Sequence, residues 1–245
     1  MRAPVEASSL AAEAYTVVRQ RILRGELALG QVISRRKLAV ELGMSFLPVS
    51  EALLRLEFEG LLESRPRAGT RVRIPSPEDV KGLYVVREAL EVQAVALFAR
   101  VATPNERVEL RRLAARVDAL SMQSDRMLYL EAHLQLHRQI AECTRCAPLW
   151  EAIEKTHALA TIWFCVMRKP SASDSPTRHQ DLLDALCQGD PAKAAEAVRQ
   201  HIAVGMQHTL EVLEPYFRLR KASGKTFFRS ERKLRRGGIE SARVN

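Results

Sequence analysis

The stretch from Leu38 to Leu62 constrains the fold more than any other part of the chain, because two short helical patterns meet there at a single glycine. Leu38 and Leu42 recur at helical spacing, and Gly43 can take the positive φ at which a helix must stop. The second helix has a buried face whose members repeat every three or four residues: Val49, Ala52, Leu53 and Leu56. Two helices joined by such a turn are typical of a helix-turn-helix.

The flanking segments extend this unit into a winged helix. Ser45 is a good helix N-cap, Pro48 lies within the first turn where its missing N–H costs nothing, and Gly60 ends the helix. Residues 61–74, LLESRPRAGTRVRI, then predict two short strands around a Pro-Arg-Ala-Gly turn. With one more amphipathic helix upstream, residues 13–75 are predicted to hold three helices and a wing.

At these residues the chain resembles the amino-terminal domain of the GntR family of bacterial transcription regulators. The family pattern is a glycine, an apolar residue, Ser-Arg-Thr-Pro-Val-Arg-Glu-Ala, and an apolar helix that ends in Glu-Gly-Leu. The corresponding run here is Gly43-Met44-Ser45-Phe46-Leu47-Pro48-Val49-Ser50-Glu51-Ala52, continuing to Glu59-Gly60-Leu61. Phe46 and Ser50 therefore stand where the family has two arginines that it typically aims at the operator.

The resemblance and the residue types together give candidate DNA contacts: Arg36, Ser45, Phe46, Leu47, Ser50, Arg67 and Gly69. Arg36 matches a family contact on the preceding helix, and Arg67 and Gly69 belong to the wing. Arginine to guanine is the commonest specific major-groove contact, so without the family arginines we expect weaker dependence on guanine. Phe46 and Leu47 can contact thymine methyl groups, or they can pack on the protein. The two serines can hydrogen-bond to phosphate or base edges.

Charge is distributed unevenly along the 245 residues. Lys+Arg exceed Asp+Glu by four in residues 1–75 and by eight in residues 217–245, whereas acids exceed bases by three in residues 76–216. The net charge of +9 favours a polyanionic partner. We therefore assign double-stranded DNA to the winged helix, with the basic tail as a helper.

The sequence offers no membrane or export signal. No apolar run approaches the ~20 residues needed to cross a bilayer, and the start, MRAPVEASSL, lacks the apolar core of a signal peptide. We therefore expect a cytoplasmic protein without membrane contact. Of the four cysteines only Cys143-x-x-Cys146 has suggestive spacing, and it follows no strand, so reduced structural thiols are expected.

From Ser76 to Pro215 the pattern is helical throughout. Ser76 and Thr103 each precede a proline, and each has an acid three residues later, which is a strong helix-start signal. Six helices are predicted, one from about 77 to 102 and the others near 104–121, 125–145, 148–168, 176–188 and 191–214. The predicted fold class is mostly α, with a winged helix-turn-helix followed by an all-helical bundle.

Two phrases of this region resemble the FCD effector domain of the FadR-type GntR regulators. They are Val86-Arg87-Glu88-Ala89-Leu90-Glu91 and Leu136-His137-Arg138-Gln139-Ile140-Ala141, and the resemblance covers about residues 13–214. It implies a homodimer and a small carboxylate effector. We expect a flexible N-terminus (1–12), a DNA-binding domain (13–75), an effector-binding and dimerisation domain (76–216) and a disordered or loosely helical basic tail (217–245).

Four histidines fall where a helical bundle can gather them. His133 and His137 lie one helical turn apart, about 6 Å of rise, which suits two ligands of one ion. In the FCD family an Asp-x3-His pair and one histidine on each of two later helices ligate a divalent metal. His137, His179 and His201 match three of these positions, and His133 replaces the aspartate. Because imidazole is itself a good ligand, the resemblance implies a metal site with zinc or nickel favoured. The alternative is ordinary core or surface histidines.

Arg87 faces the bundle interior by helical register, and an interior arginine must find an anion. The resemblance implies that it meets the effector carboxylate near the metal. The alternative is an internal ion pair with Glu91 or another acid.

The leading hypothesis is a ligand-responsive transcription regulator without enzymatic activity. One alternative is an effector-independent, nucleoid-type DNA-binding protein. The other is a helical-bundle metalloenzyme, for which Asp181 or Asp184 near His179 would have to supply the general base.

Overall fold

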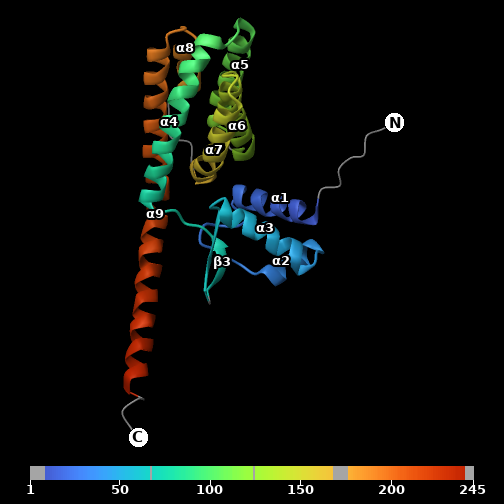
Figure 1. Cartoon of the computed structure of the whole chain (residues 1–245), viewed down its shortest axis with the longest axis vertical. Helices are drawn as coiled ribbons and strands as arrows, with labels where there is room; N and C mark the ends of the chain where they lie inside the picture. The colour runs from blue at the N-terminus through green and yellow to red at the C-terminus, as the bar shows by residue number, and fades with distance from the viewer. Residues whose placement is uncertain (1–8, 67, 124, 168–175, 241–245) are drawn as a thin grey trace, which may run out of the picture.

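The computed structural model describes residues 9–66, 68–123, 125–167 and 176–240. A small winged helix lies beside the lower end of a helical bundle, and one long C-terminal helix runs past both (Figure 1). The winged helix contains α1 (Leu10–Leu23), β1 (Val32–Ile33), α2 (Arg35–Leu42), α3 (Phe46–Phe58), β2 (Leu62–Arg65) and β3 (Gly69–Val72). The bundle contains α4 (Pro77–Val101), α5 (Pro104–Ser121), α6 (Arg126–Glu142), α7 (Ala147–Met167), α8 (Arg178–Leu186) and α9 (Pro191–Glu240).

The helix-turn-helix forms as its sequence pattern predicts. Gly43 ends α2 in the left-handed conformation, with φ of 64°, and its N–H bonds back to the last turn of the helix. The predicted apolar face of α3 is fully buried and packs against α1. That burial fixes the direction of α3, so the opposite face of this helix points into solvent.

Two details of the winged helix differ from the sequence prediction. Helix α1 begins at Leu10 rather than near residue 13, because Ser9 caps it by accepting a hydrogen bond from the backbone N–H of Ala12. The wing is a three-stranded antiparallel sheet of order β1-β3-β2 rather than a hairpin. Strand β1 has only two residues, too few for an alternating pattern to be visible in the sequence.

The starts of the first two bundle helices follow the predicted signals. Ser76 and Asp79 form a reciprocal capping box at the start of α4, and Thr103 and Glu106 form another at the start of α5. Helix α4 lies beside the upper part of α9, which extends well beyond it (Figure 1). They are joined by the hydroxyl of Tyr84, which donates to the carbonyl oxygen of Gly205 at 3.1 Å.

The end of α9 contradicts the prediction that the last helix stops before Pro215. The helix continues through Pro215 to Glu240. Leu213 and Phe217, on either side of the proline, are both buried, and this burial helps to offset the lost hydrogen bond. The carbonyl that loses its helical donor is that of Glu211, whose side chain, like that of Pro215, lies on the exposed side of α9 where water is available. Phe217 is therefore part of the core rather than of the tail.

None of the described helices is long and apolar enough to cross a membrane. The thiols of Cys143, Cys146 and Cys187 are free, and burial raises the pKa of Cys143 to about 11. A thiol with so high a pKa stays protonated at neutral pH, as expected of a structural rather than a redox-active cysteine. The side chain of Cys165 lies outside the described part of the chain.

The adjacent residues Leu53 and Leu54 give a matched test of the α3 packing. Leu53 is fully buried, whereas Leu54 is 63% exposed. We expect Leu53→Ala to destabilise the protein by about 2–5 kcal/mol, because it removes buried apolar surface and leaves a cavity. Leu54→Ala should change the free energy of unfolding by about 0.5 kcal/mol or less. Urea denaturation followed by circular dichroism measures both, and equal effects would show that the helix is oriented differently.

Candidate metal centre and DNA-binding surface

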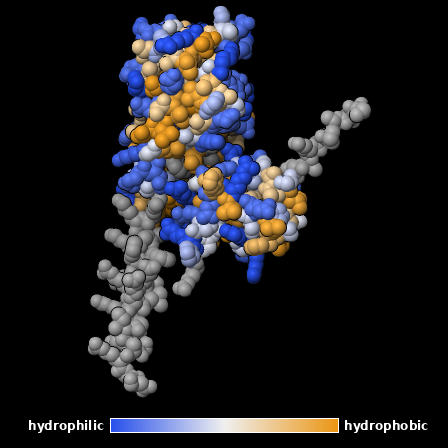
Figure 2. Space-filling view, in the orientation of Figure 1, coloured by the Kyte–Doolittle hydropathy of each residue, from blue (hydrophilic) through white to orange (hydrophobic). Residues whose placement is uncertain are grey.

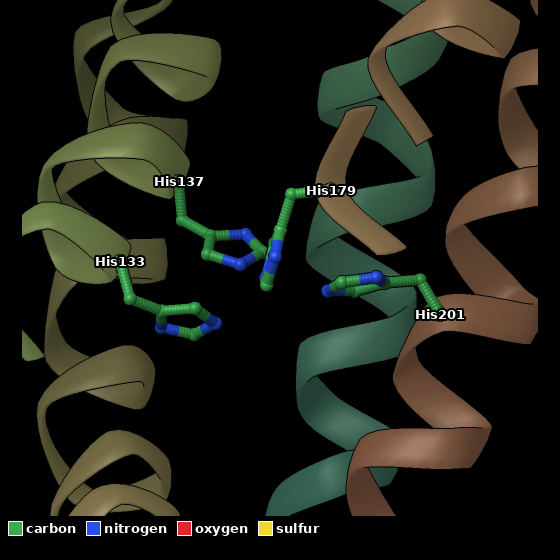
Figure 3. A group of neighbouring side chains, drawn as sticks. All are labelled: His133, His137, His179 and His201. Atoms are coloured by element: carbon green, nitrogen blue, oxygen red, sulfur yellow. The ribbon is translucent and has the colours of Figure 1, made fainter. Parts of the chain in front are cut away.

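Four histidine side chains converge inside the bundle. His133 and His137 come from α6, His179 from α8 and His201 from α9, and their rings point toward a common centre (Figure 3). All four are buried, and one nitrogen of each lies within 4.8 Å of those of the others. Four zinc–nitrogen bonds of about 2 Å in a tetrahedron place the nitrogens about 3.3 Å apart, so the rings would have to move closer together by up to about 1.5 Å. The predicted residues are therefore brought together, in an arrangement that can hold a divalent ion once the side chains close around it.

Asp118 on α5 orients one of these rings, and the sequence prediction missed it. Its carboxylate lies 2.6 Å from Nδ1 of His179 and also accepts the backbone N–H groups of His179 and Gln180. Thr177, the N-cap of α8, makes no side-chain capping bond, so Asp118 caps this helix from a different helix. The one signal in the sequence is register, because Asp118 occupies an inward-facing position next to Val117, four residues after Ala114.

The protonation state of two rings of the cluster suits metal ligation. Burial lowers the pKa of His179 to about 4 although Asp118 opposes the shift, and burial with the charge of Arg178 lowers the pKa of His201 well below its ordinary value. Both rings are therefore neutral at pH 7. Because Nδ1 of His179 holds a proton toward Asp118, its Nε2 presents a lone pair to the cluster. That atom is buried and has no hydrogen-bond partner among the described residues.

Arg87 lies beside the cluster, and its guanidinium is paired with an acid of the same helix. Its Nε donates to Glu91 at 2.8 Å, and both side chains are buried. Burial alone would lower the pKa of Arg87, but the charges of Glu91 and Tyr84 and the hydrogen bonds to them together raise it. The other oxygen of Glu91 lies 3.5 Å from Nδ1 of His137. The internal ion pair considered from the sequence is thus present, and it connects Arg87 to a histidine of the cluster.

The candidate DNA contacts differ in how exposed they are to solvent. Arg36, Ser45, Phe46, Leu47 and Gly69 are exposed, and Gly69 starts β3 with φ of 75°. The hydroxyl of Ser45 makes no capping bond, which leaves it free to meet a phosphate. Arg67 lies outside the described residues.

Ser50 differs from its expected role at the DNA surface. Its hydroxyl oxygen is buried and has no hydrogen-bond partner among the described residues. Because the oxygen is buried, the hydrogen bond to DNA expected from Ser50 is not available in this conformation. Sequence register alone did not separate it from its exposed neighbours.

Two family models match the chain. The model for bacterial regulatory proteins of the gntR family matches residues 10–72, and the model for the FCD domain matches residues 82–204. This chain belongs to the GntR family. The FCD match contains all four clustered histidines, Asp118 and Arg87. The predictions of a GntR-type regulator, of a mostly α fold and of no enzymatic activity are therefore confirmed.

Individual relatives agree with this assignment. The chain is 28% identical over 208 residues to a probable D-xylose utilization operon transcriptional repressor from Paenarthrobacter nicotinovorans. The aligned region covers 82% of this chain and 89% of that protein. It is 26% identical over 193 residues to the HTH-type transcriptional repressor RspR from Escherichia coli K12, covering 77% and 83%. A crystal structure of a GntR regulator from Rhodococcus sp. RHA1 shares the fold, with a TM-score of 0.70 at 24% identity, covering 83% of this chain and 98% of that one.

The histidine cluster predicts a bound ion that depends on each ring. Elemental analysis of protein purified without added metal should find a divalent transition metal at about one per chain. His137→Ala should lose it, because one of four ligands is removed. His208→Ala is the matched control, since His208 lies about 10 Å along α9 from His201 and outside the cluster. Trace metal in the wild type, together with a silent metal titration, would contradict the prediction.

Proposed function

We propose that this protein is a ligand-responsive transcription regulator that binds operator DNA as a homodimer in the bacterial cytoplasm. The winged helix contacts the DNA, and the FCD domain holds a divalent metal and a small carboxylate effector. The convergence of four buried histidines within the FCD domain is the observation that carries this proposal. The effector acts by binding one dimer geometry better than another, which changes how the two winged helices are presented.

The ligand set supports zinc or nickel rather than magnesium or calcium. All four candidate ligands are imidazoles, and nitrogen ligands favour zinc, nickel and copper, whereas magnesium and calcium need oxygen. His133, His137, His179 and His201 would hold the ion, which would supply a positive charge for an anionic effector. Asp118 would keep His179 in the correct tautomer.

The ion pair of Arg87 and Glu91 suggests how a carboxylate effector is accommodated beside the cluster. A cavity beside the cluster is lined by Glu91, His137 and apolar side chains, and it has room for about one water molecule. A carboxylate effector therefore needs this part of the bundle to rearrange. Its carboxylate would replace that of Glu91 as the partner of Arg87, so that the buried arginine never loses an anion.

The bundle surface supports a dimer. Apolar side chains gather on the surface of the bundle (Figure 2). Separately, three large apolar residues of this domain are exposed: Val85 and Val86 on α4 and Val204 on α9. An apolar surface rimmed by polar residues is typical of a protein interface. A two-fold dimer would present two winged helices to a palindromic operator.

The proposal predicts that an organic or sugar acid changes DNA affinity. A thermal-shift screen of such acids should give a hit that raises the melting temperature of the protein and depends on metal, since the metal and Arg87 form one site. The same acid should change the dissociation constant for operator DNA about 5- to 150-fold, as measured by fluorescence anisotropy.

Two controls sharpen this test. Arg87→Met keeps a long apolar stem but should abolish the response to the acid, whereas Arg100→Met, on the same helix at an exposed position, should keep it. An acid that stabilises the protein without changing DNA affinity would contradict the regulatory role. DNA binding with no responding acid would favour an effector-independent DNA-binding protein.

The basic C-terminal part of α9 should add to the salt dependence of DNA binding. Residues 220–245 carry nine Lys and Arg and two Glu, and the side chains of this segment lie outside the described part of the chain. A truncation after Leu219, which retains the buried Phe217, should flatten the plot of log affinity against log salt. Sequence preference should not change, because contacts to phosphates carry no sequence information. An unchanged slope would remove this segment from the DNA interface.

A further inference from the structure

The N-terminal end of α3 is apolar where it faces solvent. Phe46 is 53% exposed and Leu47 is 66% exposed, and neither belongs to the hydrophobic core. Both leave more than half of their surface in water, so packing on the protein does not account for them. Figure 2 shows apolar side chains on the surface of the winged helix as well as on the bundle. A large exposed apolar side chain at a functional surface indicates a contact with a partner.

The charged side chains of α3 do not make this helix basic. Its single arginine, Arg55, donates to Glu59 at 3.1 Å and lies 3.9 Å from the centre of the Tyr15 ring, so it is held by the protein. Glu57 is bonded to Ser64. Glu51 is exposed, and its position one turn after Leu47 places both side chains on one face of the helix. The solvent-facing surface at the N-terminal end of α3 thus consists of two apolar side chains, Phe46 and Leu47, and the carboxylate of Glu51.

The neighbouring helix identifies DNA as the partner. Arg36 and Lys37 at the start of α2 are exposed, and cations there can bind phosphates and set the position of α3. In a helix-turn-helix the N-terminal residues of the second helix reach the base edges. Within α3 these residues are Phe46, Leu47 and, one turn later, Glu51.

We propose that α3 reads its operator through thymine methyl groups, contacted by Leu47 and Phe46, and through a cytosine amino group that donates to Glu51. The thymine methyl is the one apolar feature of the major groove, and the cytosine amino group is a donor that a carboxylate can accept. A carboxylate facing the two acceptors of guanine is repelled, so Glu51 also discriminates against guanine at its position. This inference rests on the proposed function, since it requires binding to operator DNA.

Leu54 provides a matched control for Leu47. It is the same residue on the same exposed face, 63% exposed against 66%, but it lies seven residues later. Seven residues advance about 10 Å along the helix, beyond the turns that enter the groove. Truncation of the two leucines removes equal apolar surface, so only the contact with DNA differs.

Selection of binding sites from random DNA, followed by base substitution, tests the inference. In a selected duplex, each conserved thymine is replaced by deoxyuridine, which lacks only the methyl group. Wild-type affinity should fall about fourfold for each contacted methyl, the factor expected for burial of one methyl-sized group. Leu47→Ala should lose the sensitivity at the thymine that Leu47 contacts, and Leu54→Ala should keep it at every thymine. Replacing conserved guanines by 7-deazaguanine should leave affinity unchanged.

The outcomes separate the two proposals. If selection enriches no motif, sequence-specific regulation itself fails, and this inference fails with it. If a motif is enriched but tolerates deoxyuridine or depends on guanine N7, the thymine readout is wrong while the regulator remains. Sensitivity to deoxyuridine that persists in both Leu47→Ala and Phe46→Ala would likewise overturn the assignment of these side chains.

Discussion

The buried hydrogen bonds of Asp118 hold together the part of the bundle on which the histidine cluster depends. One carboxylate on α5 caps the N-terminus of α8 and fixes the ring of His179. Burial alone would raise the pKa of Asp118, but the hydrogen bonds from His179 and Gln180 hold it below its ordinary value. Its negative charge also lies at the positive end of the α8 dipole. The position of α8 and the orientation of its histidine are therefore set by the same group.

Burial of the histidine cluster costs the folded state free energy. Four imidazoles replace apolar side chains at the centre of the bundle, and the buried Nε2 of His179 has no partner within the described chain. A buried polar atom without a hydrogen bond destabilises the folded state by about 1–3 kcal/mol. Sites of this kind persist where a ligand satisfies the free atoms, and binding of that ligand then stabilises the folded state.

Local signals in the sequence were sufficient for most of the fold. The Gly43 turn and the proline-containing caps at Ser76 and Thr103 act over three or four residues, so a single sequence reveals them. The clustering of the histidines came instead from the family resemblance, since helical spacing relates only the two on α6.

What the sequence did not reveal depends on contacts between distant residues or on side-chain conformation. Asp118 and His179 are 61 positions apart, and no local pattern links them. The two residues of β1 become a strand only because β3 lies beside them. Helix α9 continues past Pro215, where burial of Leu213 and Phe217 helps to offset the proline's local preference. The inward hydroxyl of Ser50 is a rotamer, which periodicity cannot fix.

Two departures from the family pattern change the charge where this protein would meet its anionic ligands. At the FCD site His133 replaces an aspartate, so a bound ion would keep more of its charge for an effector carboxylate in a buried, weakly screened site. On α3 Phe46 and Ser50 replace arginines, so fewer cations face the DNA and fewer counterions are released. The first change would strengthen attraction for the proposed effector, and the second would weaken attraction for DNA. A regulator that holds DNA less tightly is released by a smaller coupling free energy, so under the proposed function both changes would favour a sensitive response.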